Sequence, residues 1–284
     1  AYHLLSLLEV ARPGLRLTDR FRWWAIPSDT VRAVTDQPGL LKRVVYRPAS
    51  VSIMRQRLRQ MPVDQSRLAR DLGQQRMNVN DARIRELPAL DQARVLELGY
   101  EYTAYEAATG GDKAANAISH MRSLLLARSR LEVPPQKPEV PVPSVRPDEG
   151  HKTSRISIGA GSRDGRRFEE IHLRPTYHDL LDHDAGYTRG AQIQFFDMRW
   201  RHYQDNDGLR LEEFKPLDIV SLSPRSDFFN PVSWKINVGW ARKRFSRDEE
   251  PLVFRLNGGP GLAYGAPGLF DGNAVYYGFI EAAL

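Results

Sequence analysis

The sequence contains no cysteine, which excludes disulfides and thiolate metal sites within these 284 residues. It has no run of the roughly 18 to 20 apolar residues that a membrane-spanning helix needs, and no charged-then-apolar signal peptide at its start. Lysine is also scarce, because 34 of the 41 basic residues are arginine. This skew is more typical of a GC-rich genome than of a binding site. The net charge of +6 admits an anionic partner such as nucleic acid, lipopolysaccharide or phospholipid without choosing among them.

The hydrophobic period changes once along the chain, across a proline-rich stretch at residues 132–151. Apolar residues recur at helical spacing before this stretch and alternate with polar residues after it. The pattern predicts an α+β protein in which a mainly helical part is joined by a semi-rigid linker to an antiparallel all-β, barrel-like domain. We therefore expect three segments, at residues 1–131, 132–151 and 152–284.

The first segment reads as helical over most of its length, although Val44–Tyr46 is a candidate strand. Short helices are expected over Tyr2–Val10 and over Asp29–Val34, the latter capped by Ser28. Longer helices are expected between residues 51 and 131, with breaks at Pro62, Gly73, Pro88 and Gly110-Gly111. Asp112 would cap the last helix, whose core face would carry Ile118, Met121, Leu124 and Leu125.

The last segment predicts seven strands, at residues 155–162, 168–177, 191–203, 209–222, 232–244, 252–257 and 273–284. The alternation slips at Phe195-Phe196, as a bulge would cause, and then places Asp197, Arg199 and Arg201 on one polar face. Several runs reach the roughly 9 to 11 residues of a membrane-crossing strand. A soluble sandwich would show the same alternation with shorter strands, and periodicity leaves both alternatives open.

Two clusters of polar residues invite functional readings. Residues 177–184 hold two histidines and three aspartates, which is a possible metal site. Their spacing fits no established ligand pattern, so a polar connecting segment is favoured and we predict no metal ligand and no cofactor. The second cluster is a basic helical stretch of Arg55, Arg57, Arg59, Arg67 and Arg70. It lacks aromatic platforms for bases, so a solvated face is favoured, an anionic membrane surface comes second, and nucleic acid is not expected as a partner.

Several short segments resemble the Lnb-type periplasmic domain family, which is named for a lipoprotein intramolecular transacylase, and the strand-rich domain that follows it in Gram-negative members. The first half carries the resemblance in Ala1–Val10, Arg12-Pro13-Gly14 and Ala25–Arg32. The second half carries it in Arg174–Asp182, Gly190–Ile193 and Ser221–Pro224. This family has a permuted papain-like fold, in which a cysteine opens a helix and an earlier histidine takes its proton.

The resemblance implies acyl transfer through a thioester, but it places the cysteine immediately before Ala1. Neither nucleophile nor base can be carried over, so we expect that this chain alone forms no acyl-enzyme, and whether the protein is an enzyme stays open. Tyr2 and His3 would flank the site, while Leu4, Leu5, Leu7 and Leu8 would anchor the helix in the core. The chain begins with alanine and ends within the apolar run Tyr276–Leu284, which favours a fragment.

The implied location is the periplasm or outer membrane of a Gram-negative bacterium, and the implied partners are membrane lipids or lipoproteins. The alternative is a non-enzymatic envelope scaffold or binding protein, in which the helical part binds partners and the strands anchor it. His120 and His202 are isolated in the sequence, and no serine, histidine and acid follow a recognisable triad order.

Overall fold

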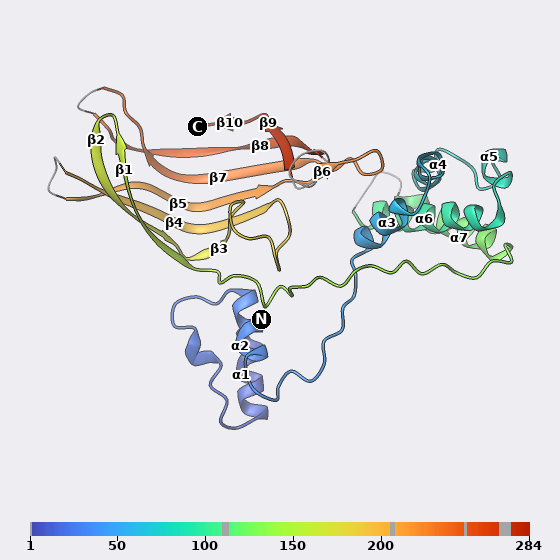
Figure 1. Ribbon diagram of the computed structural model, residues 1–284, viewed down its shortest axis with the longest axis horizontal. Helices are drawn as coiled ribbons and strands as arrows, with labels where there is room; N and C mark the ends of the chain where they lie inside the picture. The colour runs from blue at the N-terminus through green and yellow to red at the C-terminus, as the bar shows by residue number, and fades with distance from the viewer. Residues whose placement is uncertain (1, 110–113, 205–207, 247–248, 267–273) are drawn as a thin grey trace. The chain divides into compact units, whose positions relative to one another are not determined.

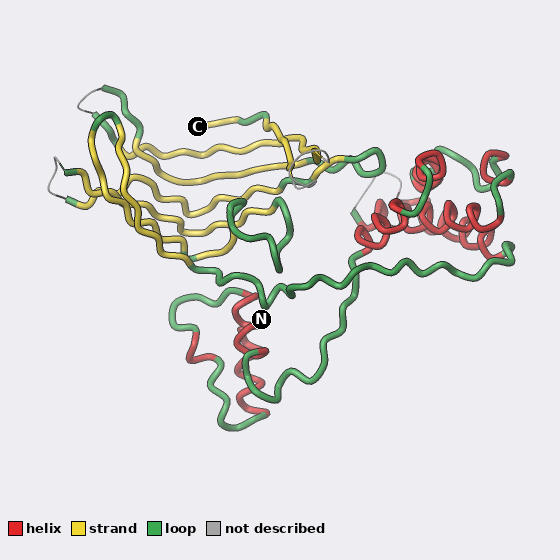
Figure 2. The backbone as a smooth tube through the Cα atoms, in the orientation of Figure 1, coloured by secondary structure: helices red, strands yellow, loops and turns green. Residues whose placement is uncertain are grey.

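The computed structural model describes residues 2–109, 114–204, 208–246, 249–266 and 274–284 (Figure 1). It divides into two compact units, one formed by residues 1–44 with 143–284 and the other by residues 45–142. The first unit combines short helices with a large sheet, and the second is helical (Figure 2). The predicted α+β class is therefore confirmed. The domain boundaries expected at residues 131 and 152 stay a prediction. The two compact units are defined by contacts in space and do not test where domains begin and end along the sequence.

The first unit begins with two helices, α1 (Tyr2–Ala11) and α2 (Pro27–Thr35), separated by the 3-10 turn η1 (Thr18–Arg20). The Glu9 carboxylate fixes the turn, because it accepts hydrogen bonds from the backbone N–H groups of Leu17 and Thr18 at 2.6 and 2.8 Å. The bonds from Thr18 and Leu17 outweigh burial and lower the pKa of Glu9. Helix α2 starts at Pro27, one residue before the predicted cap Ser28, since proline needs no hydrogen-bond partner at a first helical position.

The predicted core face of α1 is wrong in part. Leu5 is buried and Leu8 is half-buried, but Leu4 and Leu7 are mostly exposed. Leu5 and Leu8 are three residues apart and share the side that packs in this unit, and Leu4 and Leu7 share the neighbouring, uncovered side. The helix is thus anchored by one pair of leucines.

Within its described residues the second unit contains five helices, α3 (Ser50–Arg59), α4 (Val63–Gly73), α5 (Ala82–Arg85), α6 (Ala89–Ala108) and α7 (Ala114–Ser129). The breaks predicted at Pro62, Gly73 and Pro88 are observed, whereas Gly110-Gly111 and Asp112 lie outside the described residues. The strand predicted at Val44–Tyr46 is wrong, because these residues are neither helix nor strand.

The core face predicted for α7 is right at the buried Leu124 and the half-buried Met121 and wrong at Ile118 and Leu125. Leu124 and Ala117 are buried, whereas Ile118 and Leu125 are exposed. Polar residues complete the inward face: His120 Nε2 lies 2.7 Å from the carbonyl oxygen of Leu72, and Arg128 pairs with Glu97. Sequence patterning misplaced the face because it weighed the large apolar residues and ignored histidine and arginine.

Arg57 shows that the basic stretch is not wholly a solvated face. Its guanidinium pairs with Glu97 at 2.8 Å and with Glu101 at 3.0 Å, and all three side chains are largely buried. Burial raises the pKa of Glu101 although Arg57 opposes it. Arg128 Nε reaches the other oxygen of Glu97 at 2.7 Å, so one carboxylate joins α3, α6 and α7.

The sheet of the first unit follows the order β1-β2-β4-β5-β7-β8-β10, and its consecutive neighbours are antiparallel. Three short or outlying strands pair beside this path: β3 with β4, and β6 and β9 with β8. The two ends of the path, β1 and β10, do not pair within the described residues, so the sheet is open there and the barrel-like closure is not observed (Figure 1). The strands are β1 (Arg155–Arg163), β2 (Arg166–Arg174), β3 (Thr176–His178), β4 (Ala191–Tyr203), β5 (Leu209–Ser221), β6 (Pro224–Arg225), β7 (Ser233–Arg242), β8 (Leu252–Ala266), β9 (Ala274–Phe279) and β10 (Ala282–Ala283).

One face of the sheet carries a continuous apolar row, because directly paired residues on antiparallel strands share a face. The rings of Phe214 and Trp240 stack at 5.8 Å, and Trp240 meets Phe254 edge-on at 5.3 Å. The row crosses six strands through Ile156, Leu173, Met198, Phe214, Trp240 and Phe254.

The opposite face carries pairs of polar and charged side chains. His172 Nε2 lies 2.6 Å from the buried carboxylate of Asp197, and Arg201 Nε lies 2.7 Å from Glu170. Arg199 lies on the same face within 4 Å of Glu170. The predicted polar face of Asp197, Arg199 and Arg201 is therefore confirmed. Among the described residues, no helix is both long enough and apolar enough to cross a membrane.

Candidate functional site

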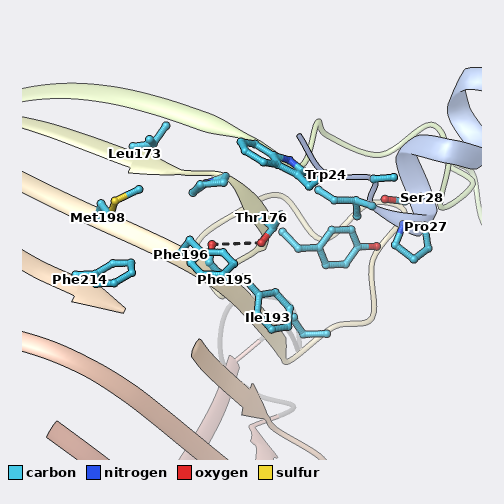
Figure 3. A pocket seen from close by; sticks show the side chains of 14 residues that line it. Trp24, Pro27, Ser28, Leu173, Thr176, Ile193, Phe195, Phe196, Met198 and Phe214 are labelled. Atoms are coloured by element: carbon cyan, nitrogen blue, oxygen red, sulfur yellow. Dashed lines mark hydrogen bonds between the residues drawn. The ribbon is translucent and has the colours of Figure 1, made fainter. Parts of the chain in front are cut away.

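A cavity of about 790 Å³ lies on the apolar face of the sheet, between the strands and the segment that leads into α2. Figure 3 shows Leu173, Met198 and Phe214 on neighbouring strands along one side, with Pro27 and Ser28 of α2, and Trp24 from the segment before it, approaching from the other. The lining is almost entirely apolar and consists of Trp24, Ala25, Ile26, Pro27, Ser28, Leu173, Pro175, Thr176, Tyr177, Ile193, Phe195, Phe196, Met198 and Phe214.

Strand β4 supplies four lining residues because its alternation changes phase at Phe196. Ile193 and Phe195 line the cavity, and so do Phe196 and Met198, which a regular strand would turn to the opposite face. Phe196 has a φ of 56°, a left-handed conformation that is uncommon for a residue with a side chain. The slip predicted at Phe195-Phe196 is thus observed, and it enlarges the apolar wall.

The cavity lining has few polar side-chain atoms, which include the hydroxyls of Thr176 on β3 and Ser28 on α2. The Thr176 hydroxyl donates to the carbonyl oxygen of Phe195 at 3.3 Å (Figure 3). The Ser28 hydroxyl is buried and has no hydrogen-bond partner among the described residues. A buried hydroxyl without a partner carries a desolvation cost, so a ligand with an acceptor at this end would gain a hydrogen bond.

The N-terminal segment is held against the sheet unit by Arg32 of α2. Its guanidinium donates to the backbone carbonyl oxygens of Asp148, Gly150 and His151 at 2.9, 3.2 and 3.3 Å. The Thr153 hydroxyl donates to Asp29, one turn earlier on α2, at 2.6 Å. These bonds fix the start of α2, and with it the wall of the cavity that Trp24 and its neighbours form.

A polar cluster lies at the end of β3, and it contains part of the histidine-aspartate segment singled out above. His178 Nδ1 lies 2.8 Å from His151 Nε2, and the two nitrogens lie 3.7 and 3.6 Å from Asp182 Oδ2. Burial, followed by the neighbouring His151, lowers the pKa of His178, so its imidazole is held neutral. Tyr187 stacks on both imidazoles, with ring centroids 4.2 and 4.3 Å away.

Two arginines hold the carboxylates of this cluster. Arg174 is fully buried and contacts Asp179 and Asp182 at 2.5 and 2.6 Å, and Arg155 contacts the same two residues at 3.0 and 2.8 Å. Burial acts to raise the pKa of Asp182, but the hydrogen bond from the backbone of Asp179 and the contact with Arg174 outweigh it, so that the pKa is lowered. The carboxylate of Asp182 is therefore ionised and fixed in orientation.

The structure brings together residues that sequence reasoning kept apart. His178 and Asp182 meet His151, which the sequence predicts to lie in the linker, while His183 lies outside the cluster of three donor atoms. Nothing in the spacing of His151 signals this, because it is 27 residues from His178. Tyr2 and His3 line neither the cavity nor the cluster; Tyr2 meets Phe21 edge-on at 6.1 Å. Their role beside a catalytic site stays a prediction.

The fold and these two sites define an α+β protein with a ligand-sized apolar cavity beside a polar histidine-carboxylate cluster. Two family models match the chain. Residues 44–140 match a domain of unknown function, DUF7842, and residues 144–284 match a second domain of unknown function, DUF7840. No curated protein and no solved structure matches the chain.

Proposed function

We propose that this chain is part of a Gram-negative cell-envelope protein and that its cavity binds an acyl chain of a membrane lipid or lipoprotein. The observation that carries the proposal is the apolar lining of the 790 Å³ cavity. This volume falls within the roughly 300 to 1,000 Å³ of small-molecule sites. An acyl chain is the apolar ligand that the resemblance to lipoprotein transacylases favours.

The distribution of polar atoms suggests how such a ligand would lie. Leu173, Met198 and Phe214 would contact the hydrocarbon, and Ser28 would donate to the ester or carboxylate oxygen near α2. This arrangement matches a ligand that has one polar end and one apolar tail.

Large apolar side chains exposed on the strands support contact with a lipid phase. Ile156 and Ile158 of β1 are 74% and 86% exposed, and Phe254 at the other end of the apolar row is 46% exposed. Contiguous exposed apolar surface marks interaction sites for proteins or membranes. We therefore propose the periplasmic side of the outer membrane, or the membrane itself, as the location.

The role proposed for this chain is binding. The thioester step that the resemblance implies requires a cysteine thiolate, and these 284 residues contain no cysteine. The chain would hold an acylated molecule, whether for a nucleophile elsewhere in the protein or as a scaffold without chemistry.

The binding test uses a fluorescent palmitoyl probe displaced by unlabelled palmitate. Phe196→Asp places a charge in the cavity at a half-exposed side chain, so the fold should tolerate it, and affinity should fall at least about tenfold, equivalent to 1.4 kcal/mol. Ser28→Ala should weaken binding by the 0.5 to 1.5 kcal/mol of one hydrogen bond.

The matched control is Phe245→Asp, the same substitution at an exposed phenylalanine outside the cavity, which should bind like the unchanged protein. Equal affinity of the Phe196→Asp variant and the unchanged protein would remove the proposal, as would an equal loss in the control. Location is tested separately: cofractionation with outer membranes supports it, and release from the membranes by carbonate opposes membrane insertion.

A further inference from the structure

We propose that His151, His178 and Asp182 bind one divalent transition-metal ion of the zinc class. Their donor atoms, Nε2, Nδ1 and Oδ2, lie within 4.8 Å of one another and come from the segment before β1, from the end of β3 and from the segment between β3 and β4. Imidazole nitrogens and a carboxylate oxygen are ligands that zinc takes in proteins. The inference is independent of the apolar cavity and its proposed ligand.

The distances form a triangle of suitable size. Tetrahedral coordination with bonds of about 2.0 to 2.1 Å separates two ligand atoms by about 3.3 Å. The two nitrogen-oxygen separations are 3.6 and 3.7 Å, and the nitrogen-nitrogen separation is 2.8 Å. The two imidazoles would move apart by about half an ångström as the ion replaced the hydrogen bond between them.

The surroundings of His151 prepare it as a ligand. Its Nδ1 lies 2.8 Å from the carbonyl oxygen of Lys152, to which a protonated Nδ1 donates. In the neutral ring this leaves the Nε2 lone pair directed at His178. Donation of the second ring nitrogen to a backbone carbonyl is the arrangement that orients metal-binding histidines in proteins.

The remaining partners fix the other ligands. Asp182 is fixed in orientation by Arg155 at Oδ1 and by Arg174 and the backbone N–H of Asp179 at Oδ2, the oxygen that would share its lone pairs with the metal. Tyr187 stacks on both imidazoles and donates its hydroxyl to the carbonyl oxygen of His151 at 2.7 Å. Three protein ligands leave a fourth position for water, and the partly exposed side chain of His151 gives solvent access.

The two arginines oppose a cation, and the balance of charge decides whether it binds. Arg155 and Arg174 carry two positive charges, and Asp179 and Asp182 carry two negative charges. The competing arrangement is a metal-free cluster in which the histidines share one proton. The metal site predicts that the chain retains one zinc ion, and the metal-free cluster predicts that it retains none.

The experiment measures zinc on the intact 284-residue chain after treatment with chelator. Zinc chloride is titrated by calorimetry, and the zinc that remains after gel filtration is counted by mass spectrometry. We expect one ion per chain. His151→Ala, His178→Ala and Asp182→Asn should each weaken binding by more than about a hundredfold, beyond the 10- to 100-fold typical for loss of a supporting partner.

His183→Ala is the matched control, because this histidine lies in the same segment and outside the cluster, and it should bind zinc normally. Cobalt(II) serves as a second probe: strong visible absorption bands report four- or five-coordinate metal, and these bands should be absent in the His151→Ala variant. Because His178 is buried, far-UV circular dichroism is used to check that the His178→Ala variant folds. If it does not fold, the test rests on the His151→Ala variant, since His151 is less buried.

The proposal is overturned if the unchanged chain retains no stoichiometric zinc. It is also overturned if His151→Ala binds zinc as tightly as the unchanged chain, or if the His183→Ala control loses as much affinity as the variants of the three ligands. None of these outcomes depends on whether the Phe196→Asp variant binds palmitate, so the metal site and the lipid cavity are tested separately.

Discussion

Arg32 and Asp148 are 116 residues apart in the sequence, yet the Arg32 Nε lies 2.9 Å from the Asp148 carbonyl oxygen. The bond joins α2 to the chain that enters the sheet. It explains why residues 1–44 group with residues 143–284 and not with the helices that follow them in the sequence.

The first prediction concerns this attachment. Arg32→Gln removes the charge and most of the bonds to three carbonyl oxygens, so the free energy of unfolding of this unit should fall by about 2 kcal/mol. Hydrogen exchange should increase over Pro27–Thr35. Arg16→Gln, at an exposed arginine, removes the same charge and should leave exchange unchanged. Unaltered exchange over α2 in the first variant would contradict the attachment.

The second prediction uses the pH dependence of Asp148. A hydrogen bond from Arg146, opposed by burial, lowers the pKa of Asp148 from 3.8 to about 2. Because the folded-state pKa is lower than the unfolded one, the stabilisation is present above about pH 4 and is lost as the pH falls toward 2. The difference in unfolding free energy between the unchanged protein and Asp148→Asn should therefore shrink between pH 4 and pH 2.

Urea unfolding at several pH values measures this difference. Asp64→Asn in the helical unit serves as baseline, because that carboxylate is 93% exposed. A gap between the unchanged protein and Asp148→Asn that stays constant down to pH 2 would argue against the role of Arg146.

The third prediction concerns close packing between α4 and α6. A Cβ added to Gly73 would lie 2.7 Å from Cδ1 and 2.9 Å from Cβ of Tyr102, so Gly73→Ala should destabilise the helical unit by about 1 to 3 kcal/mol. Circular dichroism at 222 nm during urea unfolding measures the loss. Gly159→Ala adds the same methyl group in open space on β1 and should leave the helical transition in place.

The fourth prediction concerns the carboxylate shared by three helices. Glu97→Gln leaves Arg57 and Arg128 without their common negative partner, and since these side chains are only 12% and 15% exposed, stability should fall by about 3 kcal/mol. Glu86→Gln, at an exposed position, is the control. Similar unfolding midpoints for both variants would show that the network contributes little.

The sequence predicted several of the long strands, because alternation over ten or more residues is a strong signal, but it ended the strand that starts at Leu252 at Asn257, whereas β8 continues to Ala266, and it joined β9 and β10 into one strand. The strand at Ala191–Tyr203 was predicted with its observed bounds, including the slip at Phe195-Phe196. The predicted face of α7 was wrong at Ile118 and Leu125, because His120 and Arg128 share the inward side, where each finds a polar partner that periodicity cannot reveal.

The sites were harder to predict than the fold. The cavity depends on the segment before α2 lying over the strands, and the polar cluster depends on His151 meeting His178. Both are long-range contacts, as are the bonds that Arg32 and Asp29 make with residues 148–153, and no local pattern in the sequence encodes them.

The grouping of residues 1–44 with 143–284 makes the helical unit an insertion from the standpoint of folding. For the unit that contains the sheet, residues 45–142 act as one loop of about a hundred residues that must close before α2 can dock. Each doubling of a flexible loop adds only about 0.6 kcal/mol of closure entropy. A change in the length of the insertion, in evolution or by engineering, should therefore alter the stability of the sheet-containing unit only a little, whereas the two junctions are constrained by the docking of α2.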